Sequence, residues 1–209
     1  MTRFDKLRIA LRYWLLGRTA SDPQFLVALK ALDFAEALTT GTRKDGTTPA
    51  FQHQLEIAHF LRTICHEHPA GATILAVALL HDVAEDYDVG FEELEHRFGE
   101  QVARPVALLT KKHRGTQMAA PTYFERIAAD NVASLVKGAD RINNLQSMTG
   151  VFSLEKQASY CQEVRDWFLP MLKAARRQFP GDEHRYENIK HVLRSQLELL
   201  DAVQAAHAA

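Results

Sequence analysis

An apolar segment that ends in four ionisable side chains is the part of this chain best suited to chemistry. In residues 79–86 (LLHDVAED), His81 and Asp82 follow apolar residues at helical spacing, so they are expected on or beside the buried stripe of a helix. Burying an unpaired imidazole and carboxylate costs several kcal/mol, so such groups are normally paired or bound to a metal. Glu85 and Asp86 come four residues after His81 and Asp82, which predicts that all four side chains project into one cavity.

His53 is the second candidate for an inward-facing imidazole. It is in register with Ile57 and Ile64 at helical spacing, so its side chain is expected on the buried face of a helix. His59 and His66 fall on a polar face instead and are expected in solvent. A buried histidine binds a metal or donates a hydrogen bond to a backbone carbonyl, and both alternatives stay open for His53 taken alone.

A later carboxylate, Asp140, lies in the motif VKGADRINNL, one turn after an apolar residue. Asp140, Asn144 and Ser147 fall on one stripe of the predicted helix, and Lys137 and Arg141 flank that stripe. An aspartate on an otherwise apolar face needs a partner. The alternatives are a metal ion and a salt bridge to Arg141 or to another basic residue.

Taken together, the candidate ligands are two imidazoles and two carboxylates: His53, His81, Asp82 and Asp140. A mixed nitrogen and oxygen site suits a borderline-to-hard divalent ion such as manganese and leaves positions for water and substrate. The two cysteines, Cys65 and Cys161, have no metal-type or redox spacing, which argues against structural zinc and favours reduced thiols in a cytoplasmic protein.

The composition fits one soluble globular domain: 209 residues, 46% hydrophobic and 24% charged, with a formal net charge of −1. That charge argues against a general binder of nucleic acid or membrane surfaces, so an anionic substrate needs local basic groups. The longest apolar run, Ile74 to Leu80, is too short to span a membrane. The N-terminal segment is predicted to form an amphipathic helix and not a signal peptide.

The elements that must position these residues are helices, because alternating strand patterns with hairpin turns are missing from the sequence. The predicted class is all-α: one domain over residues 1–209, with a motif-bearing core at about 22–150 and accessory helices at about 151–209. Polar loops are expected at 39–50 and 111–121. Helices are expected near 3–17, 22–38, 52–66, 72–86, 91–98, 100–110, 122–149, 154–178 and 184–206.

Residues of about 30 to 150 resemble the hydrolase domain of RelA/SpoT-type alarmone enzymes, a branch of the HD superfamily of metal-dependent phosphohydrolases. The resemblance is strongest to the small stand-alone versions related to the metazoan SpoT homologue. The matching residues are Arg43-Lys44-Asp45-Gly46 with Pro49, His53, the segment 81–86, Phe98-Gly99, Thr110-Lys111, Lys137, Ala139-Asp140-Arg141 and Asn144.

The resemblance implies hydrolysis of the 3′-pyrophosphate of guanosine tetra- or pentaphosphate with a manganese ion, giving GDP or GTP and pyrophosphate. It implies that His53, His81, Asp82 and Asp140 bind the metal and that Glu85 and Asp86 orient or deprotonate the attacking water. It further implies that Arg43 stacks on the base, Lys44 lies near the nucleotide or its phosphates, and Asn144 and Ser147 contact the nucleoside. The basic residues that could meet the phosphates are Arg43, Lys44, Lys111, Lys112, His113, Arg114, Lys137 and Arg141.

Three positions depart from the family pattern and leave the substrate base open. Pro49-Ala50-Phe51 stands in place of a Pro-Tyr pair, Gln54 in place of a proline after the metal histidine, and Tyr87 in place of a threonine. The alternatives are hydrolysis of the adenosine analogue, of another phosphorylated nucleotide such as NADPH, or of a 5′-nucleotide, and a non-catalytic nucleotide-binding module. The expected partner is a nucleotide polyphosphate, with no nucleic acid or membrane. The helices after 150 are expected to complete the core or to form a homodimer surface.

Overall fold

The structure, a computed structural model, describes residues 1–113 and 115–208. The chain divides into two compact units, an N-terminal unit of Met1–Met118 and a C-terminal unit of Ala119–Ala209. The predicted all-α class is confirmed, and in the part of the chain described no helix is long and apolar enough to cross a membrane. That the whole chain works as one domain stays a prediction.

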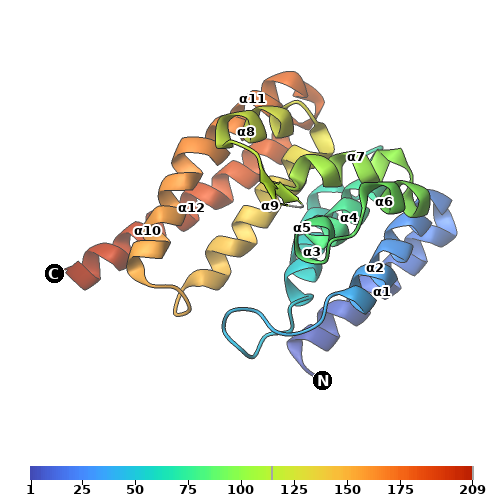
Figure 1. Cartoon of the computed structure of the whole chain (residues 1–209), viewed down its shortest axis with the longest axis horizontal. Coiled ribbons are helices and arrows are strands. Elements are labelled where there is room, and N and C mark those ends of the chain that lie inside the picture. Colours follow the sequence, from blue (N-terminus) through green and yellow to red (C-terminus); the bar gives the residue numbers. More distant parts are fainter. Residues whose placement is uncertain (114, 209) are drawn as a thin grey trace. The chain divides into compact units, whose positions relative to one another are not determined.

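In the N-terminal unit, helices surround one central helix, α4, in which every residue except Thr73 is buried (Figure 1). A helix that is hydrophobic all round is buried, and α4 packs against α2, α3 and α7. The elements of this unit are α1 (Arg3–Ser21), η1 (Pro23–Phe25), α2 (Leu26–Leu38), α3 (Gln52–Cys65), α4 (Gly71–Leu80), α5 (Val83–Asp86), α6 (Phe91–Phe98), α7 (Glu100–Leu109), β1 (Lys112–His113) and β2 (Thr116–Gln117).

The helix predicted over 72–86 is interrupted at His81 and Asp82, so that prediction was wrong in one respect. Helix α4 ends at Leu80, and the short α5 begins at Val83. Aspartate is a poor residue for a helix interior because its side chain competes for backbone hydrogen bonds. Asp82 has φ −98° and ψ −8°, and its carbonyl accepts the first hydrogen bond of α5, from Asp86 at 2.9 Å. The interruption sets the direction of the side chains that follow α4.

The polar face of α3 is partly covered, because α1 packs against it. His59 Nε2 lies 2.8 Å from the carbonyl of Leu7, and Glu56 forms an ion pair with Arg3 at 2.9 Å. The prediction that His59 is in solvent was therefore wrong, whereas His66 is exposed as expected. This contact leaves the opposite face of α3 to line the interior.

The polar loop predicted at 111–121 contains a small hairpin. Lys112 pairs with Gln117 in an antiparallel register, two residues on each side. The loop at 39–50 is also ordered by short-range contacts, with an isolated bridge between Thr42 and Pro49. Paired backbone segments therefore occur in both regions of this otherwise helical unit.

In the C-terminal unit, α9 packs against α8, α10, α11 and α12. The helix expected over 122–149 is two helices, because the side chain of Asp130 caps α9 by accepting from Ala133 N at 2.9 Å. The helix expected over 154–178 contains a π-helical turn before Pro170. The elements are α8 (Ala120–Ala128), α9 (Asn131–Met148), α10 (Leu154–Glu163), η2 (Val164–Phe168), α11 (Leu169–Gln178), η3 (Pro180–Asp182) and α12 (Glu183–Ala208).

Candidate active site

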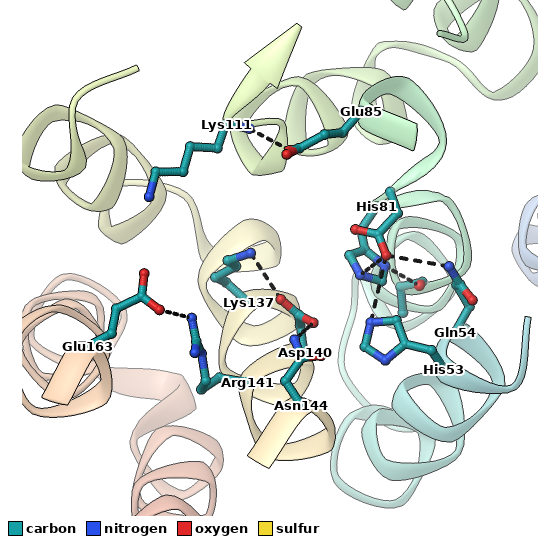
Figure 2. Close-up of polar contacts among 12 residues, drawn as sticks. His53, Gln54, His81, Glu85, Lys111, Lys137, Asp140, Arg141, Asn144 and Glu163 are labelled. Carbon is teal, nitrogen blue, oxygen red and sulfur yellow. Dashed lines mark hydrogen bonds and ion pairs between the residues drawn. The ribbon is translucent and has the colours of Figure 1, made fainter. Parts of the chain in front are cut away.

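Three candidate metal ligands meet in the N-terminal unit, where α3 begins and α4 ends (Figure 2). The ligand atoms of His53, His81 and Asp82 all lie within 4.8 Å of one another. Asp82 Oδ2 is 3.1 Å from His81 Nε2 and 3.7 Å from His53 Nε2. The two imidazole rings are 5.3 Å apart and inclined at 57°. Two nitrogens and one oxygen thus converge on a single small volume.

The tautomer of His81 makes this cluster suitable for a cation. Its Nδ1 lies 2.9 Å from the carbonyl oxygen of Ala78, and because a carbonyl can only accept, Nδ1 carries the proton. In a neutral imidazole the lone pair is then on Nε2, which faces Asp82 Oδ2. Two acceptors at 3.1 Å repel each other unless a proton or a metal ion lies with them. The donor set therefore fits a divalent ion, and the backbone contact holds the ring as metal-binding histidines are held.

Both imidazoles are buried, which makes the cluster a sheltered site. The exposed fraction is 4% for His53 and 2% for His81, whereas the side chain of Asp82 is 31% exposed. The carboxylate therefore has access to solvent on one side. This arrangement allows ligands from outside the chain to reach the cluster.

The fourth predicted ligand, Asp140, lies in α9 of the C-terminal unit, and two side chains of the same helix donate hydrogen bonds to its carboxylate. Its Oδ2 accepts from Lys137 Nζ at 3.0 Å, and its Oδ1 accepts from Asn144 Nδ2 at 2.6 Å (Figure 2). The salt bridge allowed as an alternative is thus made with Lys137. Desolvation alone would lower the pKa of Lys137, but the charge and hydrogen bond of Asp140 outweigh it and raise that pKa.

Arg141 is directed to another part of the same unit. Its Nη2 donates to the carboxylate of Glu163 in α10, and its guanidinium lies 4.8 Å from the ring centre of Tyr160 and 4.1 Å from that of Phe168. Arg141 is 7% exposed. These contacts tie α9 to α10 and η2, and its predicted contact with substrate stays a prediction. Ser147, also on α9, donates to the carbonyl of Asn144 at 3.3 Å.

The two candidate water-activating carboxylates, Glu85 and Asp86, lie in α5 and are exposed. Glu85 Oε2 accepts from the backbone N–H of Lys111 at 3.1 Å (Figure 2). The pKa of Asp86 is raised above its ordinary value by partial desolvation of the carboxyl, and further by the negative charges of Asp82 and Glu85. A carboxyl with a raised pKa is better suited to proton transfer near neutral pH.

The loop that carries Arg43 and Lys44 is shaped by Asp45. The Asp45 carboxylate accepts from the Thr48 hydroxyl and, at 2.9 Å each, from the backbone N–H groups of Thr48 and Thr47. The hydroxyl bond first, and then the two backbone bonds, lower the pKa of Asp45 to about 2. Gly46 has φ +73°, a left-handed conformation that glycine adopts without strain. Arg43 is half-buried and Lys44 is exposed. The turn therefore presents two cations on a fixed backbone.

The basic loop that starts at Lys111 is described in part. Lys111 is half-buried and Lys112 is exposed. Arg114 lies outside the described residues, as does the side chain of His113. Their predicted contact with phosphates stays a prediction.

One residue beside the cluster was not assigned a role from the sequence. Gln54 is 4% exposed, and its Nε2 lies 3.5 Å from Asp82 Oδ2. Its spacing of three residues before Ile57 places it on the buried face of α3, which is the signal that could have identified it.

Comparison with known families gives the class of this protein. Residues 31–178 match the family described as HD domain. The match covers well over half of the chain and includes the four candidate metal ligands. The chain belongs to the HD-domain family, the class of metal-dependent phosphohydrolases that the His81-Asp82 pair indicates.

Individual relatives carry more specific names. A probable guanosine-3′,5′-bis(diphosphate) 3′-pyrophosphohydrolase of Synechocystis sp. is 31% identical over 163 residues, which are 74% of this chain and 21% of that protein. The guanosine-3′,5′-bis(diphosphate) 3′-pyrophosphohydrolase of Aquifex aeolicus is 33% identical over 149 residues, 68% of this chain and 20% of that protein. The chain thus spans about a fifth of the length of these curated relatives.

A solved structure shows the same fold. It is described as a metazoan orthologue of SpoT that hydrolyses ppGpp and plays a role in starvation responses. It superposes with a TM-score of 0.60 at 23% identity and covers 78% of this chain and 93% of its own. At that identity the likeness establishes the fold.

Proposed function

We propose that this chain hydrolyses guanosine tetra- or pentaphosphate with the aid of Mn²⁺: water enters, the 3′-pyrophosphate leaves, and GDP or GTP remains. The observation that carries the proposal is the cluster of His53, His81 and Asp82, in which a histidine lone pair and a carboxylate oxygen face each other at 3.1 Å. The names of the two relatives described above support this choice of substrate and bond.

His53, His81 and Asp82 would hold the ion, and we assign Asp140 as the fourth ligand. When bound, the ion supplies a Lewis acid for a phosphoryl oxygen and lowers the pKa of a bound water molecule towards 7. The Nδ1 bond of His81 to Ala78 keeps Nε2 available as a ligand. Asn144 and Lys137 hold the Asp140 carboxylate in one orientation.

Glu85 is our choice for the group that takes the proton from the attacking water. Its Oε2 is fixed by the N–H of Lys111, which orients the carboxylate and leaves the proton to Oε1. The neighbouring carboxylate of Asp86 would help to orient the same water molecule.

The nucleotide would be bound by groups from the two loops and from α9. The Arg43 guanidinium has a planar face on which a base can stack, and Lys44 provides a cation for the phosphates. The remaining assigned contacts are Lys111, Lys137, Arg141, Asn144 and Ser147. Among them, Lys137 is also the partner of Asp140, so its charge would serve both the carboxylate and a phosphate.

The direct test is a product assay with purified full-length chain that has been stripped of metal and supplied with Mn²⁺. The proposal expects guanosine tetraphosphate to yield GDP and pyrophosphate in equal amounts, with no turnover before Mn²⁺ is added. Guanosine and adenosine 3′-pyrophosphates, NADPH and 5′-nucleotides tested in parallel reveal the base and bond preferred. Tight nucleotide binding without any product would point instead to a nucleotide-binding module.

Glu85→Gln tests the role of the proton acceptor. The amide keeps an oxygen for the N–H of Lys111 but cannot take a proton at neutral pH, so Mn²⁺ binding should persist while kcat falls by about 10²–10⁴-fold. Glu92→Gln, a change to an exposed glutamate in α6, serves as the control and should keep full activity. Unchanged kcat in Glu85→Gln would remove this residue from the mechanism.

The cytoplasmic location and the homodimer expected from the sequence stay predictions. Gel filtration of the purified chain with light scattering measures its mass in solution and decides between monomer and dimer.

A further inference from the structure

Gln54 is a buried amide that faces the carboxylate of the candidate metal centre. We propose that Gln54 is a positioning residue: its Nε2–H group holds the Asp82 carboxylate with Oδ2 directed at the two imidazoles. This role of Gln54 rests on the proposed function, in which Asp82 is a metal ligand. Figure 2 shows the Gln54 side chain extending from α3 toward His81.

The geometry places the amide on the same oxygen that faces both histidines. Asp82 Oδ2 lies 3.5 Å from Gln54 Nε2, 3.1 Å from His81 Nε2 and 3.7 Å from His53 Nε2. A distance of 3.5 Å is at the long end of a hydrogen bond. The donor therefore orients the oxygen without neutralising its charge, which a metal ligand must keep.

Burying the amide of Gln54 lowers the stability of the fold unless the amide makes a favourable contact at this position. Its side chain is 4% exposed, and its Oε1 is buried without a hydrogen-bond partner among the described residues. An amide that satisfies only one of its two ends loses free energy relative to an apolar side chain of the same size. The contact with Asp82 therefore explains why an amide, and not an apolar side chain, occupies this buried position.

The orientation of the amide follows from its neighbour. Turning the group by 180° would bring Oε1 against Asp82 Oδ2, and two acceptors repel. In the metal-free protein, Gln54 therefore turns its Nε2 atom, and not Oε1, toward the Asp82 carboxylate. A carboxylate ligand held in this way by an outer donor commonly gains 10–100-fold in metal affinity.

The test measures Mn²⁺ binding to the metal-free full-length chain by isothermal titration calorimetry, together with thermal unfolding of the same samples. Gln54→Leu removes the donor at nearly constant volume, and Gln54→Met provides a second apolar side chain if the leucine variant folds poorly. Gln54→Glu keeps the shape but replaces the donor by an acceptor. Gln52→Leu is the matched control, since it removes an amide from the same turn of α3, where Nε2 contacts Glu56 instead.

We expect Gln54→Leu and Gln54→Met to bind Mn²⁺ about 10–100-fold more weakly than the unsubstituted chain, without a lower midpoint of metal-free unfolding. Gln54→Glu should also bind more weakly, and Gln52→Leu should bind like the unsubstituted chain. If both apolar variants bind Mn²⁺ with unchanged affinity, Gln54 is a structural residue only and the positioning role is wrong. Tighter binding by Gln54→Glu would show that the side chain ligates the ion itself, which also overturns the proposal. Failure of the unsubstituted chain to bind Mn²⁺ would instead remove the metal centre, and the proposed function with it.

Discussion

The two carboxylates assigned as metal ligands, Asp82 and Asp140, have opposite kinds of neighbours. Asp82 Oδ2 faces two imidazole nitrogens at 3.1 and 3.7 Å, and all three atoms are ones that can bind a metal ion. Asp140 is bonded to an ammonium at 3.0 Å and to an amide at 2.6 Å, so its charge is already balanced. The N-terminal cluster is therefore a set of donors that gains from a cation, whereas the Asp140 cluster is complete without one. This comparison predicts that the N-terminal unit provides most of the metal affinity.

The largest effect is expected from His81→Ala. Removing a buried ligand should abolish detectable Mn²⁺ binding and turnover, a greater loss than the 10–100-fold caused by losing an outer partner. His66→Ala removes an exposed imidazole from the end of α3 and is the control. Metal binding is measured by calorimetry. Mn²⁺ binding that survives His81→Ala would place the metal elsewhere in the chain.

Lys137→Met removes the ammonium group that pairs with Asp140 and leaves the imidazoles in the N-terminal unit intact. It leaves the buried Asp140 carboxylate without its cation, and breaking such a pair costs on the order of 3 kcal/mol of unfolding free energy. Urea denaturation measures the loss. The double variant Lys137→Met, Asp140→Asn should recover most of it, because no uncompensated charge remains. A double variant no more stable than Lys137→Met would show that the charge of Asp140 is not what destabilises it.

A further group that is satisfied inside the C-terminal unit is Tyr186, whose hydroxyl contacts Ser134 at 2.8 Å and Asn131 at 3.0 Å. Burial raises the pKa of Tyr186 to about 12, against an ordinary value of 10.0, although both hydrogen bonds act to lower it. Because the folded state keeps its proton longer, stability is fully present below about pH 10 and falls as the pH rises towards 12. For a pKa difference of about two, the loss is at most about 3 kcal/mol.

Urea unfolding at several pH values between 9 and 12 measures this dependence. Tyr186→Phe should flatten it, whereas Tyr13→Phe, a change to a tyrosine that is 71% exposed, should not. Equal slopes in all three proteins would contradict the assigned pKa of Tyr186.

The smallest effect concerns the packing that positions Asp140. A Cβ on Gly138 would lie 2.7 Å from Ile189 Cγ2 and 3.1 Å from Leu172 Cδ2, so Gly138→Ala should destabilise the chain by about 1–3 kcal/mol. A Cβ on Gly17 in α1 would meet no atom of the described residues within 4 Å, so Gly17→Ala should be neutral or stabilising by up to about 1 kcal/mol. Thermal unfolding compares the two. Equal effects would mean that α9 can move away from its neighbours at no cost.

Much of the fold could be predicted from helical spacing and from breaks at proline and glycine. The helix expected over 72–86 contains the apolar run 74–80, and every residue of α4 except Thr73 is buried. Its interruption at His81 and Asp82 was missed, because Glu85 and Asp86 follow these two residues at i+4 and so favoured a continuous helix, although aspartate is a poor residue for a helix interior. The division at Asp130 was readable in principle, since an aspartate before Asn131 is a common helix cap.

In the candidate site, the inward direction of His53 and contacts within one helix could be predicted from the sequence, but the contact of Arg141 with another helix could not. Inward register identified His53, and the structure brings it to His81 and Asp82. The partner of Asp140 was available from spacing too, because Lys137 is three residues before it and Arg141 is adjacent. The contact of Arg141 with Glu163 joins residues 22 apart in sequence, so it depends on how α10 packs and no local pattern contains it.

The most direct test of the central claim is pulsed electron paramagnetic resonance of Mn²⁺ bound to full-length chain labelled with ¹⁵N-histidine. If His53 and His81 bind the ion, hyperfine couplings from two imidazole nitrogens should appear, and only one should remain in His53→Ala. A bound Mn²⁺ ion that shows no histidine coupling would mean that His53 and His81 are not its ligands, which would overturn the proposed metal centre.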